Sequence, residues 1–288
     1  MLFNTYEPWK FAFSAENENI KDDSFGIIGV PFDSTTSYHS GSRLGPIVVR
    51  EASFGFEKFN SIFNKDLTAT FYDFGDVNVV PGNCKKTCEI IEDTVNELLD
   101  LNLKPILIGG EHSASIGAIK ALAEKYEKLT VVHLDAHRDL AFEFIGEKYS
   151  HATVMRRAHE MGVNLVQIGI RSSSQDEETF VKSTYNIQTF KNRDVHKHMD
   201  ALEYYITNID GPIYISIDMD VVDPSLAPSV GNPTPGGLFI SELENIIETL
   251  SHKNIVGLDV VETASDKLGD ATAVVAAKII YDFLTLVE

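Results

Sequence analysis

Short apolar segments alternate with amphipathic segments along almost the whole chain, and this alternation constrains the fold more than any other feature of the sequence. Seven segments are short, rich in Ile and Val, and apolar at most consecutive positions. Such segments are typical of strands that are buried on both faces of a parallel sheet. They are FGIIGV (25–30), TATFYDFG (68–75), PILIGG (105–110), LTVVHLD (129–135), NLVQIGI (164–170), PIYISID (212–218) and NIVGLDVVE (254–262).

Helical patterns lie between these segments. Apolar residues recur at helical spacing over 84–102, 113–125, 241–250 and 270–286. Ser241 precedes Glu244 with the spacing of a capping box, and Asp270 is the predicted N-cap of the last helix. Strands that alternate with helices predict one parallel sheet covered on both faces. We therefore predict a single domain over residues 1–288, in which residues 1–23 form a peripheral arm.

Composition excludes several classes of protein. The 288 residues include 43 acidic residues against 24 Lys and Arg, so the formal net charge is −19. Such a surface repels nucleic acids and anionic membranes, whereas it is compatible with a cationic substrate or a bound metal ion. No apolar run is long enough to span a bilayer, and the N-terminus lacks the pattern of a secretory signal. Cys84 and Cys88 are the two cysteines. A disulfide framework is therefore excluded, and we expect a cytoplasmic protein.

Oxygen donors and imidazoles follow three of the apolar segments, at the point where each strand is expected to end. His112 follows PILIGG, D-A-H-R-D (135–139) follows VVHL, and D-M-D (218–220) follows YISI. Ligands of parallel sheets bind beyond the carboxyl ends of the strands. The first and third residues of an extended segment point the same way, so each motif can present two side chains to one cavity.

Four carboxylates that converge without a cation would repel one another, and divalent metal ions remove this conflict. Carboxylates with a minority of imidazoles, and no thiolate, suit Mn²⁺. An aspartate at one strand end is by itself an ordinary turn or cap residue, but three such motifs together favour a metal site. Six ligands are too many for one open catalytic ion and suit two ions that share bridging carboxylates. The six candidates are His112, Asp135, His137, Asp139, Asp218 and Asp220.

The same motifs resemble those of the ureohydrolase family, which includes arginase, agmatinase and guanidinobutyrase. The metal motifs that carry the resemblance are GGEHS (109–113), DAHRDL (135–140), SIDMDVVDP (216–224) and GLDVVE (257–262). Bacterial agmatinases are the more similar branch, through PFDSTTSYHSGSRLGP (31–46), FYDFGDV (71–77), EKYSHATVMRRAHEMG (147–162) and GIRS (169–172). The resemblance extends from about residue 25 to the C-terminus.

This resemblance implies a three-layer α/β/α fold with a mainly parallel eight-stranded sheet, assembled into homotrimers or hexamers. It also implies two Mn²⁺ ions per subunit. One ion would take His112, Asp135, Asp139 and Asp218 as ligands. The other would take Asp135, His137, Asp218 and Asp220, so that Asp135 and Asp218 bridge the two ions.

The resemblance further implies a hydrolytic mechanism. A guanidinium is a poor electrophile, and a hydroxide that bridges two metal ions supplies a strong nucleophile near neutral pH. Asp139 would take the proton of this hydroxide, and Glu262 would clamp the guanidinium through paired hydrogen bonds. His151 would pass a proton to the leaving amine, a task that suits imidazole. The chain departs from the family pattern after Glu262, where Thr263-Ala264-Ser265 replaces Val-Xaa-Pro, and at Ala152, where many relatives have Gly.

The segment 140–150 bears on the substrate. It contains no Asn and a single Ser, unlike the polar loop with which arginase recognises the α-carboxylate and α-amine of its substrate. Glu143 and Glu147 would repel a carboxylate and tolerate an ammonium, which favours agmatine, hydrolysed to putrescine and urea. His39 lies in the loop SYHSGSR, which lines the active-site mouth in agmatinases. Guanidinobutyrase, arginase and formiminoglutamase activities stay open, as do a non-catalytic metal-binding relative and another two-metal hydrolase such as a phosphatase.

Overall fold

The structure is a computed structural model that describes residues 2–6, 9–18 and 20–287. Its centre is a sheet with the strand order β1-β5-β2-β6-β11-β10-β7-β8-β9, in which all neighbours from β5 to β9 are parallel. The strands are β1 (Thr5–Tyr6), β2 (Phe25–Gly29), β5 (Phe71–Val77), β6 (Lys104–Ile108), β7 (Thr130–Leu134), β8 (Asn164–Ile170), β9 (Ile187–Lys191), β10 (Ile213–Asp218) and β11 (Ile255–Val261). A separate hairpin joins β3 (Phe59–Asn60) to β4 (Lys65–Asp66).

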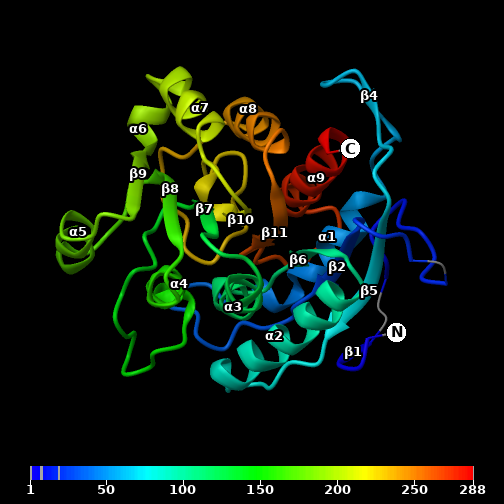
Figure 1. Ribbon diagram of the computed structural model, residues 1–288, viewed down its shortest axis with the longest axis horizontal. Helices are drawn as coiled ribbons and strands as arrows, with labels where there is room; N and C mark the ends of the chain where they lie inside the picture. The colour runs from blue at the N-terminus through cyan, green and yellow to red at the C-terminus, as the bar shows by residue number, and fades with distance from the viewer. Residues whose placement is uncertain (1, 7–8, 19, 288) are drawn as a thin grey trace.

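Helices cover both faces of this sheet. Figure 1 shows α2, α3 and α4 together on one side of the sheet, and α8 and α9 on the other. The α-helices are α1 (Gly45–Ser53), α2 (Cys84–Asp100), α3 (Ser115–Lys125), α4 (Val154–Glu160), α5 (Gln175–Lys182), α6 (Asn192–Val195), α7 (Met199–Thr207), α8 (Ile240–Ser251) and α9 (Ala271–Leu286). Short 3₁₀ turns are η1 (Ser42–Leu44), η2 (His112–Ala114), η3 (His151–Thr153) and η4 (Met219–Val221). Each face of the sheet carries its own apolar core, so the three-layer α/β/α fold is confirmed.

The apolar segments predicted the strands well. All seven coincide with parallel strands, and the burial of nearly every residue in them explains why they lack polar alternation. The eighth parallel strand, β9, was not predicted, because it lies at the sheet edge and the exposure of its side chains is mixed. The two-residue strand β1 adds a ninth, antiparallel strand at the opposite edge, beyond the eight expected.

Parts of the predicted peripheral arm take part in the packing. Strand β1 pairs with β5, and the side chain of Phe11 is 2% exposed. The backbone N–H of Phe11 donates a 2.7 Å hydrogen bond to Asp73 Oδ2. Asp73 also receives the buried guanidinium of Arg50, which ties α1 to β5.

The four helices predicted from apolar periodicity are confirmed as α2, α3, α8 and α9. Asp270 caps α9 as predicted, because its Oδ1 accepts the N–H of Thr272 at 2.9 Å. The predicted capping box at Ser241 is wrong. The helix α8 begins one residue earlier than the prediction, so Ser241 lies inside it, and Glu242 accepts the N–H of Phe239 instead. None of the helices in the described part of the chain combines the length and hydropathy that a membrane crossing requires.

Candidate active site

Four neighbouring strands in the middle of the sheet deliver the predicted ligands to one place. The order β6-β11-β10-β7 puts the carboxyl ends of these strands side by side. His112 opens η2 shortly after β6, Asp135 follows β7 directly, Asp218 ends β10, and Glu262 follows β11. Parallel strands collect the residues after their carboxyl ends at one edge, so a site forms there although its residues are far apart in sequence.

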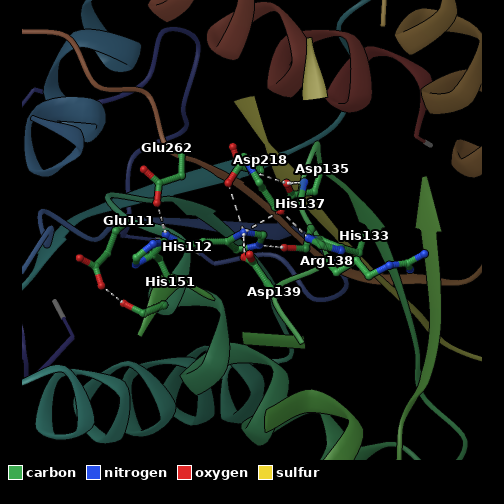
Figure 2. A network of polar contacts seen from close by, with 12 residues as sticks. Glu111, His112, His133, Asp135, His137, Arg138, Asp139, His151, Asp218 and Glu262 are labelled. Carbon is green, nitrogen blue, oxygen red and sulfur yellow. Dashed lines mark hydrogen bonds and ion pairs between the residues drawn. The ribbon is translucent and has the colours of Figure 1, made fainter. Parts of the chain in front are cut away.

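Three carboxylates surround one nitrogen of His112. Its Nδ1 lies 3.0 Å from Asp139 Oδ2 and 3.2 Å from the Oδ2 atoms of both Asp135 and Asp218. Figure 2 shows Asp218 and Asp139 turned toward the His112 ring from opposite sides. All four side chains are buried, so these charges are shielded from bulk water.

The hydrogen bond at the other ring nitrogen of His112, Nε2, determines whether Nδ1 carries a hydrogen or a lone pair. Ser216 Oγ donates its proton to Asp259 Oδ1 at 2.8 Å, so it can only accept from His112 Nε2, 3.0 Å away. The neutral imidazole therefore carries its proton on Nε2, and its Nδ1 lone pair faces three carboxylate oxygens. Nδ1 is a buried atom without a hydrogen-bond partner among the described residues. Lone pairs that converge in this way fit a bound cation, and a hydrogen-bonded Nε2 is the usual support of a metal-ligating histidine.

A second ligand group adjoins the first through Asp135. The Oδ2 of Asp135 lies at His112, whereas its Oδ1 lies 3.5 Å from His137 Nδ1. His137 Nδ1 is also 2.8 Å from Asp220 Oδ2. One carboxylate thus offers an oxygen to each group, which is the arrangement that two neighbouring metal ions require. Asp218 Oδ1 accepts the N–H of Asp220, so only its Oδ2 is directed at His112.

The close spacing of these buried groups shifts their pKa values. Burial raises the pKa of Asp218 well above its usual value, and the charges of Asp220 and Asp135 raise it further. Burial would lower the pKa of His112, but the three aspartates around its Nδ1 raise it well above the usual range. In the same way the aspartates raise the pKa of His137 to about 12. Bound positive charge, from protons or metal ions, would therefore stabilise the cluster by reducing the repulsion among its carboxylates.

Residues outside the predicted set orient the ligands. His133 Nε2 donates to Asp135 Oδ2 at 2.7 Å, because its Nδ1 accepts from Gln167 Nε2 at 3.1 Å. Asn232 Nδ2 lies 3.1 Å from His137 Nε2. His133 is buried in β7 and packs beside the ligands. Nothing in the local sequence pattern indicated Gln167 or Asn232, since each contacts its histidine from a distant part of the chain.

Glu262 lies at the wall of the same cavity. It is 6% exposed, and its Oε1 accepts the N–H of His112 at 2.8 Å, whereas its Oε2 has no partner among the residues described. Burial and the nearby charge of Glu111 raise its pKa to about 8. A Cβ on Gly231 would lie 2.8 Å from Oε2, so the absence of a side chain at this position leaves room for the carboxylate. The departure from the family pattern after Glu262 has not moved it away from the cavity.

A cavity of about 310 Å³ connects these residues. Of the eight predicted site residues, Asp135 lies fully buried beneath the cavity and the other seven line it. His151 is one of the seven, and its ring packs edge-on against Phe144 with 5.0 Å between ring centroids. His39 also lines the cavity and stacks on Tyr38.

Two predictions about the cavity mouth are wrong. Glu143 and Glu147 are exposed, and neither lines the cavity. The carboxylate that does line the outer part is Glu177, the N3 residue of α5, which accepts hydrogen bonds from Ser174 and from the N–H of Leu140. Its contribution could not be read from the sequence, since it depends on how α5 packs against the segment after β7.

Comparisons with known proteins agree with this fold and site. A sequence model of the arginase family matches residues 23–285. The chain is 39% identical to the N(1)-aminopropylagmatine ureohydrolase of Thermococcus kodakarensis, over 96% of this chain and 94% of that protein. It is 35% identical to the agmatinase of Pyrococcus horikoshii, over 98% of this chain and 97% of that protein. Among solved structures, the agmatine ureohydrolase of Thermoplasma volcanium superposes with a TM-score of 0.87 at 32% identity, covering 98% of this chain and 94% of that chain.

The fold and the site together define a class of three-layer α/β/α protein with a His/Asp cluster that can hold metal ions at the carboxyl ends of central parallel strands. The chain belongs to the arginase family, and its relatives include proteins named agmatinase and ureohydrolase. The family resemblance predicted from the motifs is therefore confirmed.

Proposed function

We propose that this protein is a binuclear manganese enzyme that hydrolyses a linear guanidine with a cationic tail, most simply agmatine to putrescine and urea. One observation carries the proposal. The lone pair of His112 Nδ1 and the oxygens of Asp135, Asp139 and Asp218 converge on one point, with the His137–Asp220 group beside them and the unpartnered Oε2 of Glu262 on the same cavity.

The donor set supports manganese. In the proposed ligand set four aspartates outnumber two histidines, and neither cysteine takes part, which favours Mn²⁺ over softer ions. His112, Asp135, Asp139 and Asp218 would hold one ion, and Asp135, His137, Asp218 and Asp220 the other. Two bound divalent ions lower the pKa of a shared water, which makes it a nucleophile at neutral pH.

The side chains around the cluster have distinct roles in this proposal. Glu262 binds the guanidinium through Oε2 and holds its carbon toward the cluster, because a carboxylate matches the planar N–H fork. Asp139 accepts a proton from the attacking water. His151 delivers a proton to the departing amine nitrogen, so water adds to carbon as the carbon–nitrogen bond breaks.

The cavity wall favours an amine tail over a carboxylate tail. Arg138 is the sole Lys or Arg among the described residues that line the cavity. Its side chain is 2% exposed, and its guanidinium binds Glu178, Gln167 and Thr189. No free cation therefore faces the carboxylate that arginine, guanidinobutyrate or formiminoglutamate would bring. Glu177 is the acidic group toward which an ammonium would be drawn.

A second substrate with the same chemistry is N1-aminopropylagmatine, in which the amine tail is longer. The relative at 39% identity is named for it. The two substrates share the guanidinium and the clamp, and they differ in how far the tail extends from the cluster. The proposal of guanidine hydrolysis does not depend on which of them is preferred.

A hydrolysis assay tests the proposal. Protein stripped with EDTA and reloaded with Mn²⁺ should release urea from agmatine and from N1-aminopropylagmatine. We expect lower kcat/KM for arginine and 4-guanidinobutyrate, and for formiminoglutamate assayed through formamide. No turnover of any of these compounds by protein shown to contain two metal ions per chain would reject the proposal.

Matched variants separate the site from general effects. Asp135→Asn should abolish urea release and lower the bound metal, because its two oxygens serve both ligand groups. Asp93→Asn, an exposed aspartate of α2, should leave activity and metal content unchanged. A chromogenic phosphate ester included in the same screen tests the alternative of a two-metal phosphatase.

We also propose the assembly and location that the resemblance implies, a cytoplasmic homotrimer or hexamer that binds neither nucleic acid nor membranes. The net charge of −19 supports the absence of polyanionic partners. Analytical ultracentrifugation of the purified chain tests the assembly, and a monomer at micromolar concentration would contradict it.

A further inference from the structure

A chain of hydrogen bonds runs from a buried glutamate to the histidine that lines the cavity. Glu111 is 0% exposed and lies next to the ligand His112, yet its side chain faces away from the ligand group. Its Oε2 accepts the N–H of Thr35 at 2.6 Å, and its Oε1 lies 2.5 Å from Thr35 Oγ1. Figure 2 shows Glu111 and His151 together at one end of the cluster.

Thr35 connects this carboxylate to His151. Its Oγ1 accepts the backbone N–H of His151 at 3.0 Å and lies 3.3 Å from the ring nitrogen Nδ1. The three residues come from the loops after β2, β6 and β7, so only the folded sheet brings them together. The metal ligands and the proposed clamp do not involve Thr35. It lies in the segment 31–46 that contributes to the family resemblance, but the sequence pattern assigned it no role of its own.

The number of protons decides the direction of each bond. Glu111 Oε1 accepts from Thr35 Oγ1 at 2.5 Å and from Ser113 Oγ at 2.5 Å, so the single hydrogen of Thr35 Oγ1 lies on its contact with Glu111. Thr35 Oγ1 can then only accept from His151. The ring nitrogen Nδ1 must therefore carry a hydrogen, and in the neutral imidazole the lone pair is left on Nε2.

We propose that Thr35, held by Glu111, is a positioning residue that keeps His151 in the Nδ1–H tautomer with Nε2 free for proton transfer. Nε2 has no hydrogen-bond partner within the described residues, and the ring lines the cavity. This inference rests on the proposed function, because it has Nε2 take up the proton that Asp139 accepts from the attacking water and pass it to the departing amine nitrogen. The carbon–oxygen bond forms, the carbon–nitrogen bond breaks, and His151 ends as it began.

The Glu111→Gln variant gives a directional test. The fixed N–H of Thr35 must still face an acceptor, so the amide oxygen takes the place of Oε2 and the amide nitrogen that of Oε1. The amide nitrogen then donates to Thr35 Oγ1, which is free to donate its own hydrogen to His151 Nδ1. The tautomer should switch, with the hydrogen on Nε2 in place of Nδ1.

Proton-detected correlation spectra of ¹⁵N-histidine-labelled protein read the tautomer without any activity. Zinc-loaded protein keeps the sample diamagnetic, and a His151→Asn variant assigns the signal. We expect a hydrogen on Nδ1 in the wild type and on Nε2 in Glu111→Gln. A wild-type ring with its hydrogen on Nε2 would overturn the inference, whether or not the protein hydrolyses guanidines.

Kinetics provide the second readout. Thr35→Val keeps the shape and removes the hydroxyl, so kcat should fall about 10- to 100-fold. This is less than the roughly 10²- to 10⁴-fold contributed by a proton-transfer group itself, because His151 is still present. KM and bound metal should stay near wild type, because the clamp and the ligands are intact. Thr35→Ser restores the hydroxyl and should recover most of kcat, and thermal melting shows whether each variant is folded.

Ser34→Ala is the matched control in the same loop. Ser34 Oγ accepts the N–H of Gly82 at the surface and does not line the cavity, so its kcat should be that of the wild type. A folded Thr35→Val enzyme with wild-type kcat, or a Thr35→Ser enzyme as slow as Thr35→Val, would contradict the role of the hydroxyl. If the wild type turned over no guanidine at all, the proposed function would fail, and the spectra would still decide the tautomer.

Discussion

Two residues of the site adopt a backbone conformation that their side chains disfavour. Asp139 has φ 53° and Glu262 has φ 63°, both in the left-handed region. Such a conformation costs a non-glycine residue roughly 1–3 kcal/mol and persists only where the surroundings impose it. At Asp139 the result is a carboxylate turned back toward His112, and at Glu262 a carboxylate whose Oε1 meets the N–H of His112. Local strain thus accompanies the placement of both groups.

Glu262→Gln tests the clamp at the residue scale. The amide oxygen should keep the bond to the N–H of His112, and the amide nitrogen then replaces the unpartnered Oε2 with a donor. A hydrogen bond to a charged group contributes about 1.5–3 kcal/mol, so we expect kcat/KM for agmatine to fall about 10- to 150-fold. Bound metal should not change. The exposed Glu127→Gln serves as the control, and an unaltered kcat/KM in Glu262→Gln would remove the clamp from the mechanism.

At the scale of elements, the residues at the ends of helices and strands determine how the site is held. The helices α2 and α9 begin at side-chain caps, Asn83 and Asp270, and their periodic apolar faces pack on the sheet. The segment after β7 has no such regular pattern. It is held instead by contacts with α5, where Glu177 and Glu178 bind Leu140 and Arg138.

The correction at α8 gives a stability prediction. Asp270→Ala removes an N-cap and should lower the free energy of unfolding by about 1 kcal/mol, within the usual range of 0.5–2 kcal/mol. Ser241→Ala changes an exposed interior position of α8, where alanine has the higher helix propensity, so it should be neutral or slightly stabilising. Urea unfolding at pH 7 measures both. A larger loss for Ser241→Ala than for Asp270→Ala would contradict the assignment of the two helix starts.

The contact between α5 and Arg138 predicts a pH dependence. Hydrogen bonding and charge from Arg138 lower the pKa of Glu178 to about 2 from a usual value of 4.5. A carboxyl whose pKa is lower in the folded state stabilises above its unfolded pKa, and this stabilisation is lost as the pH falls from about 4.5 to about 2. The wild type should therefore be more stable than Glu178→Gln at pH 7, and the difference should shrink toward pH 2.

Urea unfolding of both proteins at several pH values measures this difference. The exposed Glu248→Gln in α8 is the control and should match the wild type at pH 7. A stability difference between wild type and Glu178→Gln that stays constant down to pH 2 would show that the Arg138 contact acts through packing alone.

The whole molecule decides which residues meet. The strand order puts β11 and β10 between β6 and β7, so the chain must complete its last strand before the site is whole. Two apolar cores, one on each face of the sheet, hold the four central strands rigidly, and the ligands follow their carboxyl ends. The stability of this framework offsets the repulsion among the buried carboxylates.

Metal removal should therefore affect the stability of the entire chain. A ligand that binds only the folded state at about a hundred times its Kd adds about 2.7 kcal/mol per site. For a chain of this size that corresponds to a rise in Tm of about 5–10 °C on adding Mn²⁺ to stripped protein. Asp220→Asn should show a smaller rise in differential scanning calorimetry. An equal rise in the variant would mean that Mn²⁺ stabilises the protein elsewhere.

Much of this could be predicted from the chain alone. A strand buried on both faces must be apolar at consecutive positions. The seven buried strands could therefore be recognised in the sequence as apolar segments. The polar residues just after these segments could be recognised as candidate ligands, because several carboxylates at neighbouring strand ends would repel one another without a cation. The edge strand β9 was missed, because a strand half exposed to water carries no such constraint.

What the chain alone could not decide are the contacts between segments distant in sequence. Thr35 meets Glu111, Arg138 meets Glu178, and Glu177 in place of Glu143 or Glu147 lines the cavity. Apolar patterning and ligand motifs are local properties, determined by the sequence by itself. Tertiary packing alone sets the order of the strands, the side chains that orient each ligand and the cavity wall that the substrate tail would meet. Each of these depends on distances between residues that are far apart in sequence, and local sequence patterns do not fix such distances.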